Sequence, residues 1–74
     1  MNINEHIAKR ILALRKEKSF TAEKLAWTAD LSKSCVSYAE KGIKDTKIST
    51  INAICNALDI TLAEFFKIFD YKID

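Results

Sequence analysis

Turn-forming residues are nearly absent from this chain. Its 74 residues include no proline and a single glycine, Gly42. A β-sandwich or β-barrel needs turn residues about every 8–12 positions, so the sequence excludes an all-β fold. Hydrophobic residues form 49% of the chain and charged residues 30%, which supplies enough apolar material for a core. The composition predicts an all-α fold, and the length predicts one domain over residues 1–74.

Basic residues are concentrated in the first two thirds of the chain. Residues 1–47 contain ten Lys or Arg and six Asp or Glu, a net charge of +4, whereas residues 48–74 have a net charge of −2. A polyanion would therefore meet the N-terminal part more favourably than the C-terminal part.

The chain offers little to a metal ion, a cofactor or a membrane. Cys35 and Cys55 form no CxxC motif, and His6 is the only histidine. One disulfide is arithmetically possible, but we expect two reduced, buried thiols, with no metal site and no cofactor. There is no signal peptide and no apolar run of about 18 residues, so we expect a cytoplasmic, nucleoid-associated protein. Without a glycine-rich phosphate loop or a His-based nucleophile pair, we do not expect an enzyme.

Apolar residues recur at helical spacing in the first half of the chain. The first helix is predicted over about residues 4–18, with an apolar face formed by Ile3, Ile7, Ile11 and Leu14. Thr21 is a good N-cap for a second helix over about 21–28 that buries Leu25, Ala26 and Ala29, and Ser32 for a third that Gly42 ends after about residue 41. A short turn at Asp30 joins these two helices, which predicts a helix-turn-helix over about 21–41.

Two further helices are predicted in the second half. A buried stripe indicates a helix over about 48–58, formed by Ile51, Ile54, Cys55 and Leu58. Thr61 and Glu64 have the spacing of a capping box, in which the Glu64 side chain reaches back to the N-cap, and an aromatic-rich fifth helix follows. Because Phe65 and Phe66 suffice to close a small core, the segment over about 61–74 carries surplus apolar side chains. We expect a homodimer interface formed by Phe66, Phe69, Tyr71 and Ile73, with an extra core layer as the alternative.

Together these segments resemble the lambda-repressor-like, or Cro/XRE-type, helix-turn-helix family. The matching segments are Ile7–Arg15, Phe20–Ala26, Leu31–Gly42, Ile48–Ile51, Ala57–Ile60 and Glu64–Phe66. The resemblance covers about residues 5–67 and implies a compact five-helix DNA-binding domain. Three positions depart from the family pattern: Ala22 replaces a glutamine that supports phosphate contact, Asp30 a glycine of the turn, and Thr46 a proline.

The resemblance also implies which residues meet DNA. It places the third helix in the major groove and predicts base contacts by Lys33, Ser34, Ser37 and Tyr38. Backbone amides at a helix start and flexible ammonium groups suit phosphate, which predicts phosphate contacts by Ser32, Lys41, Lys44 and Lys47. Exposed lysines are otherwise usually just solvated, and serines often cap helices. Arg15 and Glu40 occupy positions that resemble a partly buried structural ion pair.

We therefore expect a sequence-specific transcription regulator that binds double-stranded DNA. A homodimer would place two third helices in successive major grooves about 34 Å apart on a palindromic operator. Small single domains of this kind resemble phage Cro-type repressors and restriction–modification controller proteins, and no small-molecule effector is implied.

The alternative is a helix-turn-helix protein-interaction module, antitoxin-like or acting on another regulator, with weak or no specific DNA binding. Ala22, the formal charge of only +2, and two exposed apolar candidates, Trp27 and Leu12, favour this alternative. Trp27 could cover the core or contact a partner. The charge of residues 1–47 and the Ser-Lys start of the third helix favour DNA binding.

Overall fold

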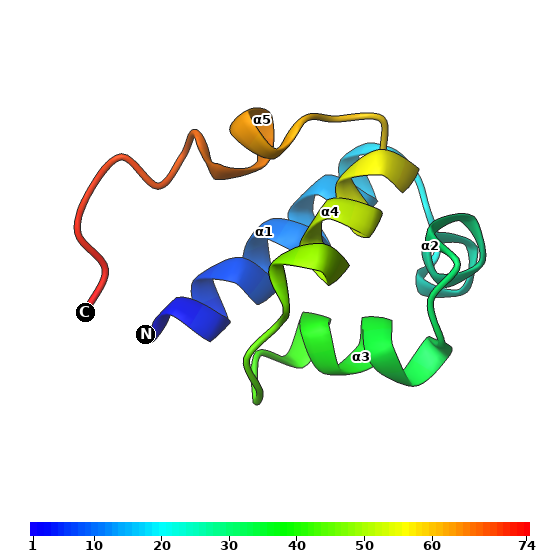
Figure 1. The fold of residues 1–74 in the computed structure, drawn as a ribbon, viewed down its shortest axis with the longest axis horizontal. Coiled ribbons are helices and arrows are strands. Elements are labelled where there is room, and N and C mark those ends of the chain that lie inside the picture. The colour runs from blue at the N-terminus through cyan, green and yellow to red at the C-terminus, as the bar shows by residue number, and fades with distance from the viewer.

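The computed structural model describes all 74 residues, and helices are its only regular secondary structure (Figure 1). Its helices are α1 (Ile3–Glu17), α2 (Ala22–Ala29), α3 (Lys33–Lys41), α4 (Ile48–Ala57) and α5 (Leu62–Phe66). The prediction of an all-α, five-helix fold is confirmed, and the first four helices lie close to their expected bounds. No helix combines the length and the apolar character that a membrane span requires.

Most helices begin at a side-chain cap. The hydroxyls of Thr21, Ser32 and Thr61 each accept a hydrogen bond at 3.0 Å from the backbone amide three residues later. Each such cap stabilises a helix by about 1 kcal/mol. Helix α1 begins at a capping box that sequence analysis did not identify. There the Asn2 side chain accepts from the Glu5 amide at 2.9 Å, and the Glu5 carboxylate accepts from the Asn2 amide at 3.2 Å.

The capping box predicted at the start of α5 forms only in part. The Thr61 hydroxyl accepts from the Glu64 amide as expected, but the Glu64 carboxylate does not reach back to the N-cap. It lies instead 2.9 Å from Nζ of Lys67, one turn further along the chain. That ammonium group competes for the same carboxylate, so the reciprocal half of the prediction was wrong.

The core is a cluster of twelve buried residues to which every helix contributes. Its members are Ile7, Ile11, Leu14, Leu25, Ala26, Val36, Ala39, Ile51, Ile54, Cys55, Leu58 and Phe65. Helix α3 packs against α1 and α2, and α4 packs against α2 and α5. The prediction that Ile3 belongs to the buried face was wrong, because this first residue of α1 is 43% exposed. Ala29 is only half-buried.

Gly42 ends α3 and allows the chain to turn towards α4. Its φ of +68° lies in the left-handed region, where a side chain is strained. A Cβ atom at this position would lie 3.0 Å from the carbonyl oxygen of Asn4 and 3.1 Å from Cα of Glu5. The end of α3 therefore approaches the backbone of α1 so closely that a side chain at this position would push against it. Figure 1 shows α3 along the lower edge of the molecule, away from α5.

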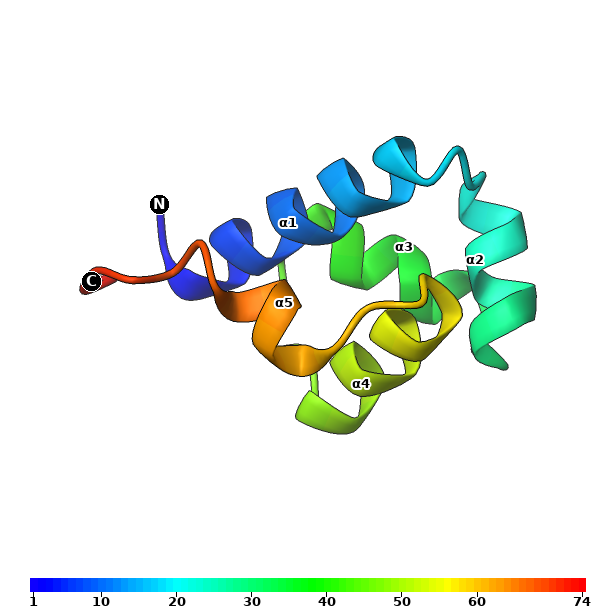
Figure 2. The same cartoon turned by 90° about the horizontal axis from the view of Figure 1, so that it is seen from above.

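Helix α5 ends at Phe66, so the aromatic segment is less helical than its sequence suggests. The Arg10 guanidinium, on α1, donates to the carbonyl oxygens of Glu64 and Phe65 at 2.8 Å each. In a longer helix these carbonyls would accept from the amides of residues 68 and 69. The remaining residues form a tail that leaves the helix and ends near the N-terminus (Figures 1 and 2).

Candidate nucleic-acid interface

The turn between α2 and α3 is fixed by backbone geometry. Asp30 has φ 58° and ψ 42°, a left-handed conformation that Asp tolerates better than most residues. The Leu31 amide donates to the carbonyl oxygen of Ala26 at 2.9 Å, and the Leu31 side chain packs against the core. Ser32 then caps α3. The turn conformation, the Leu31 contacts and the Ser32 cap together fix the direction of α3 relative to α2.

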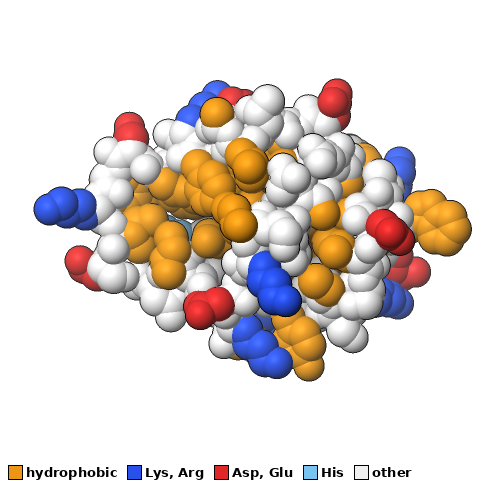
Figure 3. Space-filling view, in the orientation of Figure 1, with side chains coloured by type: hydrophobic (Ala, Val, Ile, Leu, Met, Phe, Trp, Pro, Cys, Tyr) orange, Lys and Arg blue, Asp and Glu red, His pale blue; other side chains and the backbone are white.

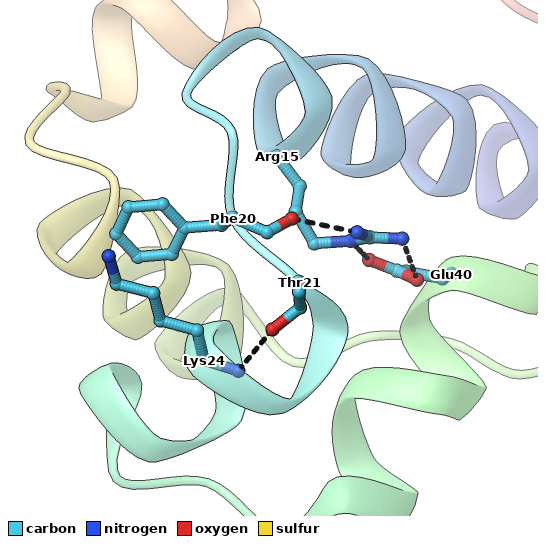
Figure 4. A network of polar contacts seen from close by, with 5 residues as sticks. All are labelled: Arg15, Phe20, Thr21, Lys24 and Glu40. Atoms are coloured by element: carbon cyan, nitrogen blue, oxygen red, sulfur yellow. Dashed lines mark hydrogen bonds and ion pairs between the residues drawn. The ribbon is translucent and has the colours of Figure 1, made fainter.

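A second constraint on the helix-turn-helix comes from Arg15 at the end of α1 (Figure 4). Its Nε donates to Oε2 of Glu40 at 2.6 Å and its Nη2 to Oε1 at 3.2 Å, while Nη1 donates to the carbonyl oxygen of Phe20 at 2.9 Å. The two charged side chains are only 15% and 13% exposed. The Lys24 ammonium lies 4.6 Å from the centre of the Phe20 ring. This network ties α1, the start of α2 and α3 together.

The two faces of α3 have opposite characters. Val36 and Ala39 are buried in the core, so the other face of the helix must point to solvent. That face lines an open depression of about 360 Å³, bounded by Lys33, Ser34, Ser37, Tyr38 and Lys41. The structure therefore brings together all four base-contact candidates and one phosphate-contact candidate on one surface.

A second depression of about 230 Å³ adjoins the first, since Tyr38 lines both. It contains Lys44 and Lys47 of the α3–α4 connection, and the Lys44 ammonium lies 4.5 Å from the centre of the Tyr38 ring. Figure 3 shows basic side chains gathered over this connection at the lower edge of the molecule. Ser32 lines neither depression; its hydroxyl caps α3.

Sequence reasoning missed the structural role of Arg10. Arg10 lies beside the apolar face of α1, and its guanidinium joins α1 to α5 through the two carbonyls described above. The available signal was its position next to Ile11, at the border of that face.

Two titratable groups near Arg10 have pKa values that differ from their ordinary ones. A hydrogen bond from Lys67 lowers the pKa of Glu64, and burial raises the pKa of Cys55 against the opposing charge of Arg10.

The candidate dimer residues lie at the end of α5 and in the tail. Phe66 and Phe69 are half-buried and pack against the core, with their rings 6.0 Å apart, and Ile73 is also half-buried. Tyr71 is 56% exposed. The His6 ring lies 6.2 Å, edge-on, from both the Phe69 and the Tyr71 rings, which holds the tail against α1. Part of the segment thus serves as an added core layer, and Tyr71 is left available to a partner.

The apolar candidates on the remaining surface differ from one another. Trp27, on the outer side of α2, is 87% exposed and does not cover the core. Leu12 is half-buried rather than exposed. Ala22, where the family pattern has glutamine, packs partly against the core.

An all-helical fold in which a fixed turn presents the polar face of one short helix defines a helix-turn-helix DNA-binding protein. The chain matches the sequence model of the Cro/C1-type helix-turn-helix DNA-binding domain over residues 10–70, and it belongs to this family. Proteins of this class are DNA-binding transcription regulators rather than enzymes.

A solved structure shares the whole fold. The crystal structure of a tyrosine-to-phenylalanine mutant of the restriction–modification controller protein C.Esp1396I superposes with a TM-score of 0.83. The match covers 97% of this chain and 100% of that one, at 23% sequence identity. A search of curated protein sequences finds no relative of this chain.

Proposed function

We propose that this chain is a sequence-specific transcription regulator that binds a palindromic operator as a homodimer, with residues 1–74 acting as one domain. One observation carries the proposal. The solvent-facing side of α3 gathers Lys33, Ser34, Ser37 and Tyr38 into one open surface, which we call the reading face. Further lysines flank it. An α-helix fits the major groove of B-DNA, and these side chains suit the hydrogen-bonding edges presented there.

Base reading falls to the first turns of α3. Lys33 donates to guanine O6 and N7, which is a common specific contact of a basic side chain in the major groove. Ser34 and Ser37 donate to or accept from almost any base edge and so specify little alone. Tyr38 packs against a thymine methyl group or bonds to a phosphate.

Phosphate contacts position the protein on the duplex. Lys41 lies at the end of α3, and Lys44 and Lys47 follow in the connection to α4, so the three ammonium groups flank the reading face. The first amides of α3, next to Ser32, point out of a helix N-terminus, which attracts anions. These contacts fix the register of α3 in the groove without reading sequence.

The C-terminal segment supplies the partner contact. Phe66 is the last residue of α5, and Phe69, Tyr71 and Ile73 follow it in the tail; these four side chains offer the second copy an apolar surface. Two reading helices one DNA turn apart must each lie about 17 Å from the two-fold axis. The chain measures 33 × 23 × 20 Å, so two copies meeting at their tails can meet this spacing. Similarity to a controller protein supports a regulator of this kind.

The proposal is tested by selecting genomic fragments with the purified protein and footprinting the enriched ones. We expect one recurring sequence with two protected half-sites related by a dyad and separated by about 10 base pairs. Enrichment of no fragment above random DNA would contradict sequence-specific binding, and a single protected half-site would contradict the dimer.

A protein-interaction module is the second candidate, and the 87% exposure of Trp27 is the observation that favours it. An exposed indole with no covering residue is a common anchor for a protein partner. Trp27 is the only tryptophan, so its fluorescence reports contacts at this surface. An interaction module would enrich no DNA fragment and would change this fluorescence only when a protein partner is added.

A further inference from the structure

The first residue of α3 is already engaged by a carboxylate in the free protein. The Lys33 ammonium lies 3.8 Å from Oε1 of Glu23, and both side chains remain exposed, at 73% and 76%. Among the four lysines proposed to meet DNA, only Lys33 belongs to an ion pair. The acid comes from α2, outside the set of residues that line the reading face.

The position of this carboxylate has a clear electrostatic basis. Glu23 lies in the first turn of α2, where the helix N-terminus attracts negative charge. Its carboxylate also faces the ammonium group of Lys33, the first residue of α3. Glu23 therefore lies beside the ammonium group that we assign to a DNA acceptor.

We propose that Glu23 is a specificity-determining residue that suppresses binding to non-operator DNA; this inference rests on the proposed DNA-binding function. Non-specific complexes are held mainly by phosphates. A phosphate that approaches Lys33 comes close to the negative charge of the Glu23 carboxylate, which opposes its binding.

An operator treats the same pair differently. Guanine O6 and N7 are neutral acceptors, so Lys33 can reach them in the major groove without bringing a second negative charge to Glu23. The penalty from Glu23 thus falls mainly on complexes dominated by phosphate, which raises the ratio of operator to random-DNA affinity.

The test compares Glu23→Gln with Glu17→Gln on the selected operator and on a scrambled duplex. Glu17 is an exposed acid at the end of α1, so its substitution changes the net charge equally without touching Lys33. We expect Glu23→Gln to strengthen binding to the scrambled duplex by about twofold to fivefold, the range of an exposed ion pair. Operator binding gains less, so the affinity ratio falls. Glu17→Gln leaves the ratio unchanged.

A Lys33→Met background separates pairing from general charge effects. There the gain from Glu23→Gln should shrink to that of Glu17→Gln. Equal ratios for the two Glu variants, or a gain that persists without Lys33, would overturn the role of Glu23. A wild-type protein that prefers no fragment contradicts the proposed function instead. In that case the scrambled-duplex series still decides the inference, because a gain that depends on Lys33 supports it and no gain refutes it.

Discussion

At the scale of single residues, the basic side chains divide into two groups with different tasks. Arg10 and Arg15 are half-buried, and each guanidinium donates to several fixed oxygen atoms within the protein. The planar fork of Arg suits such fixed acceptors. The lysines of α3 and the following connection remain exposed. The net charge of residues 1–47 therefore overstates the number of cations that DNA can use, because both arginines serve the fold.

The proposal assigns Lys33 to base contacts and the other lysines to phosphate contacts, and single substitutions can distinguish these two roles. We expect Lys33→Ala to weaken operator binding by about 1–3 kcal/mol and to affect a scrambled duplex much less, because a base contact is lost. Lys44→Ala should weaken both complexes by similar factors, since phosphates are present in every sequence. Titration of both variants on both duplexes checks this. Equal losses at the two positions on both duplexes would remove Lys33 from the base-reading set.

The ion pair between Arg15 and Glu40 should matter to stability more than an exposed pair. Glu40→Ala leaves a guanidinium that is 15% exposed without its carboxylate, and we expect a loss of about 2–3 kcal/mol in the free energy of unfolding. Replacing both residues by Met should restore part of this loss, because no buried charge then remains. Urea unfolding measures the free energy of unfolding of both variants, and Glu17→Ala, at an exposed position, is the control. A loss under about 0.5 kcal/mol would show that the pair is a surface feature.

At the scale of helices, local signals and distant contacts were not equally readable from the sequence. The starts of α2, α3 and α5 follow from Thr21, Ser32 and Thr61, because a cap bonds to an amide three residues away. The end of α5 depends on Arg10, more than fifty positions earlier, and no local pattern contains that contact. The Glu64 carboxylate was placed wrongly for a different reason: its two candidate partners, the N-cap amide and the Lys67 ammonium, are both local, and the sequence pattern does not rank them.

Gly42 gives the sharpest test of an element boundary. We expect Gly42→Ala to destabilise the fold by about 1–2 kcal/mol, because the left-handed conformation and the approach to the α1 backbone both resist a Cβ atom. Asp59→Gly is the matched opposite, since Asp59 has a φ of 58° and already bears the strain of a side chain there. That variant should be neutral or slightly stabilising. Thermal unfolding compares the two. A tolerated Gly42→Ala would contradict the close approach of α3 to α1.

At the scale of the whole molecule, the surface proposed to contact DNA and the surface proposed to contact a second copy lie on different parts of the fold. The reading face belongs to α3 at the lower edge of the molecule, whereas α5 lies at the top and the tail runs from it down the left side (Figure 1). The resemblance to the helix-turn-helix family implied the residues of the reading face, and the burial of Val36 and Ala39 leaves these side chains on the outer side of α3. It could not predict the contact between Glu23 and Lys33 or the exposure of Trp27. Both depend on how α2 and α3 are placed in space.

The dimer proposal is best tested at Tyr71, because this side chain is 56% exposed in the single chain. We expect Tyr71→Ser to leave the fold intact and to weaken self-association by about 1–2 kcal/mol, as loss of an aromatic interface residue does. Sedimentation equilibrium measures the association constant. Lys72→Ser, at the neighbouring exposed position, is the control and should change little. A monomeric wild-type protein, or equal effects of the two variants, would contradict an interface at the tail.

The most direct test of sequence-specific reading by α3 is titration of the wild-type protein onto its selected operator and a scrambled duplex at about 50 and 200 mM salt. We predict operator binding at least about a thousandfold tighter than scrambled binding, with both complexes weakened by salt. The scrambled complex should lose the larger share of its affinity, since it depends most on phosphate contacts. Equal affinity for the two duplexes at both salt concentrations would contradict the account.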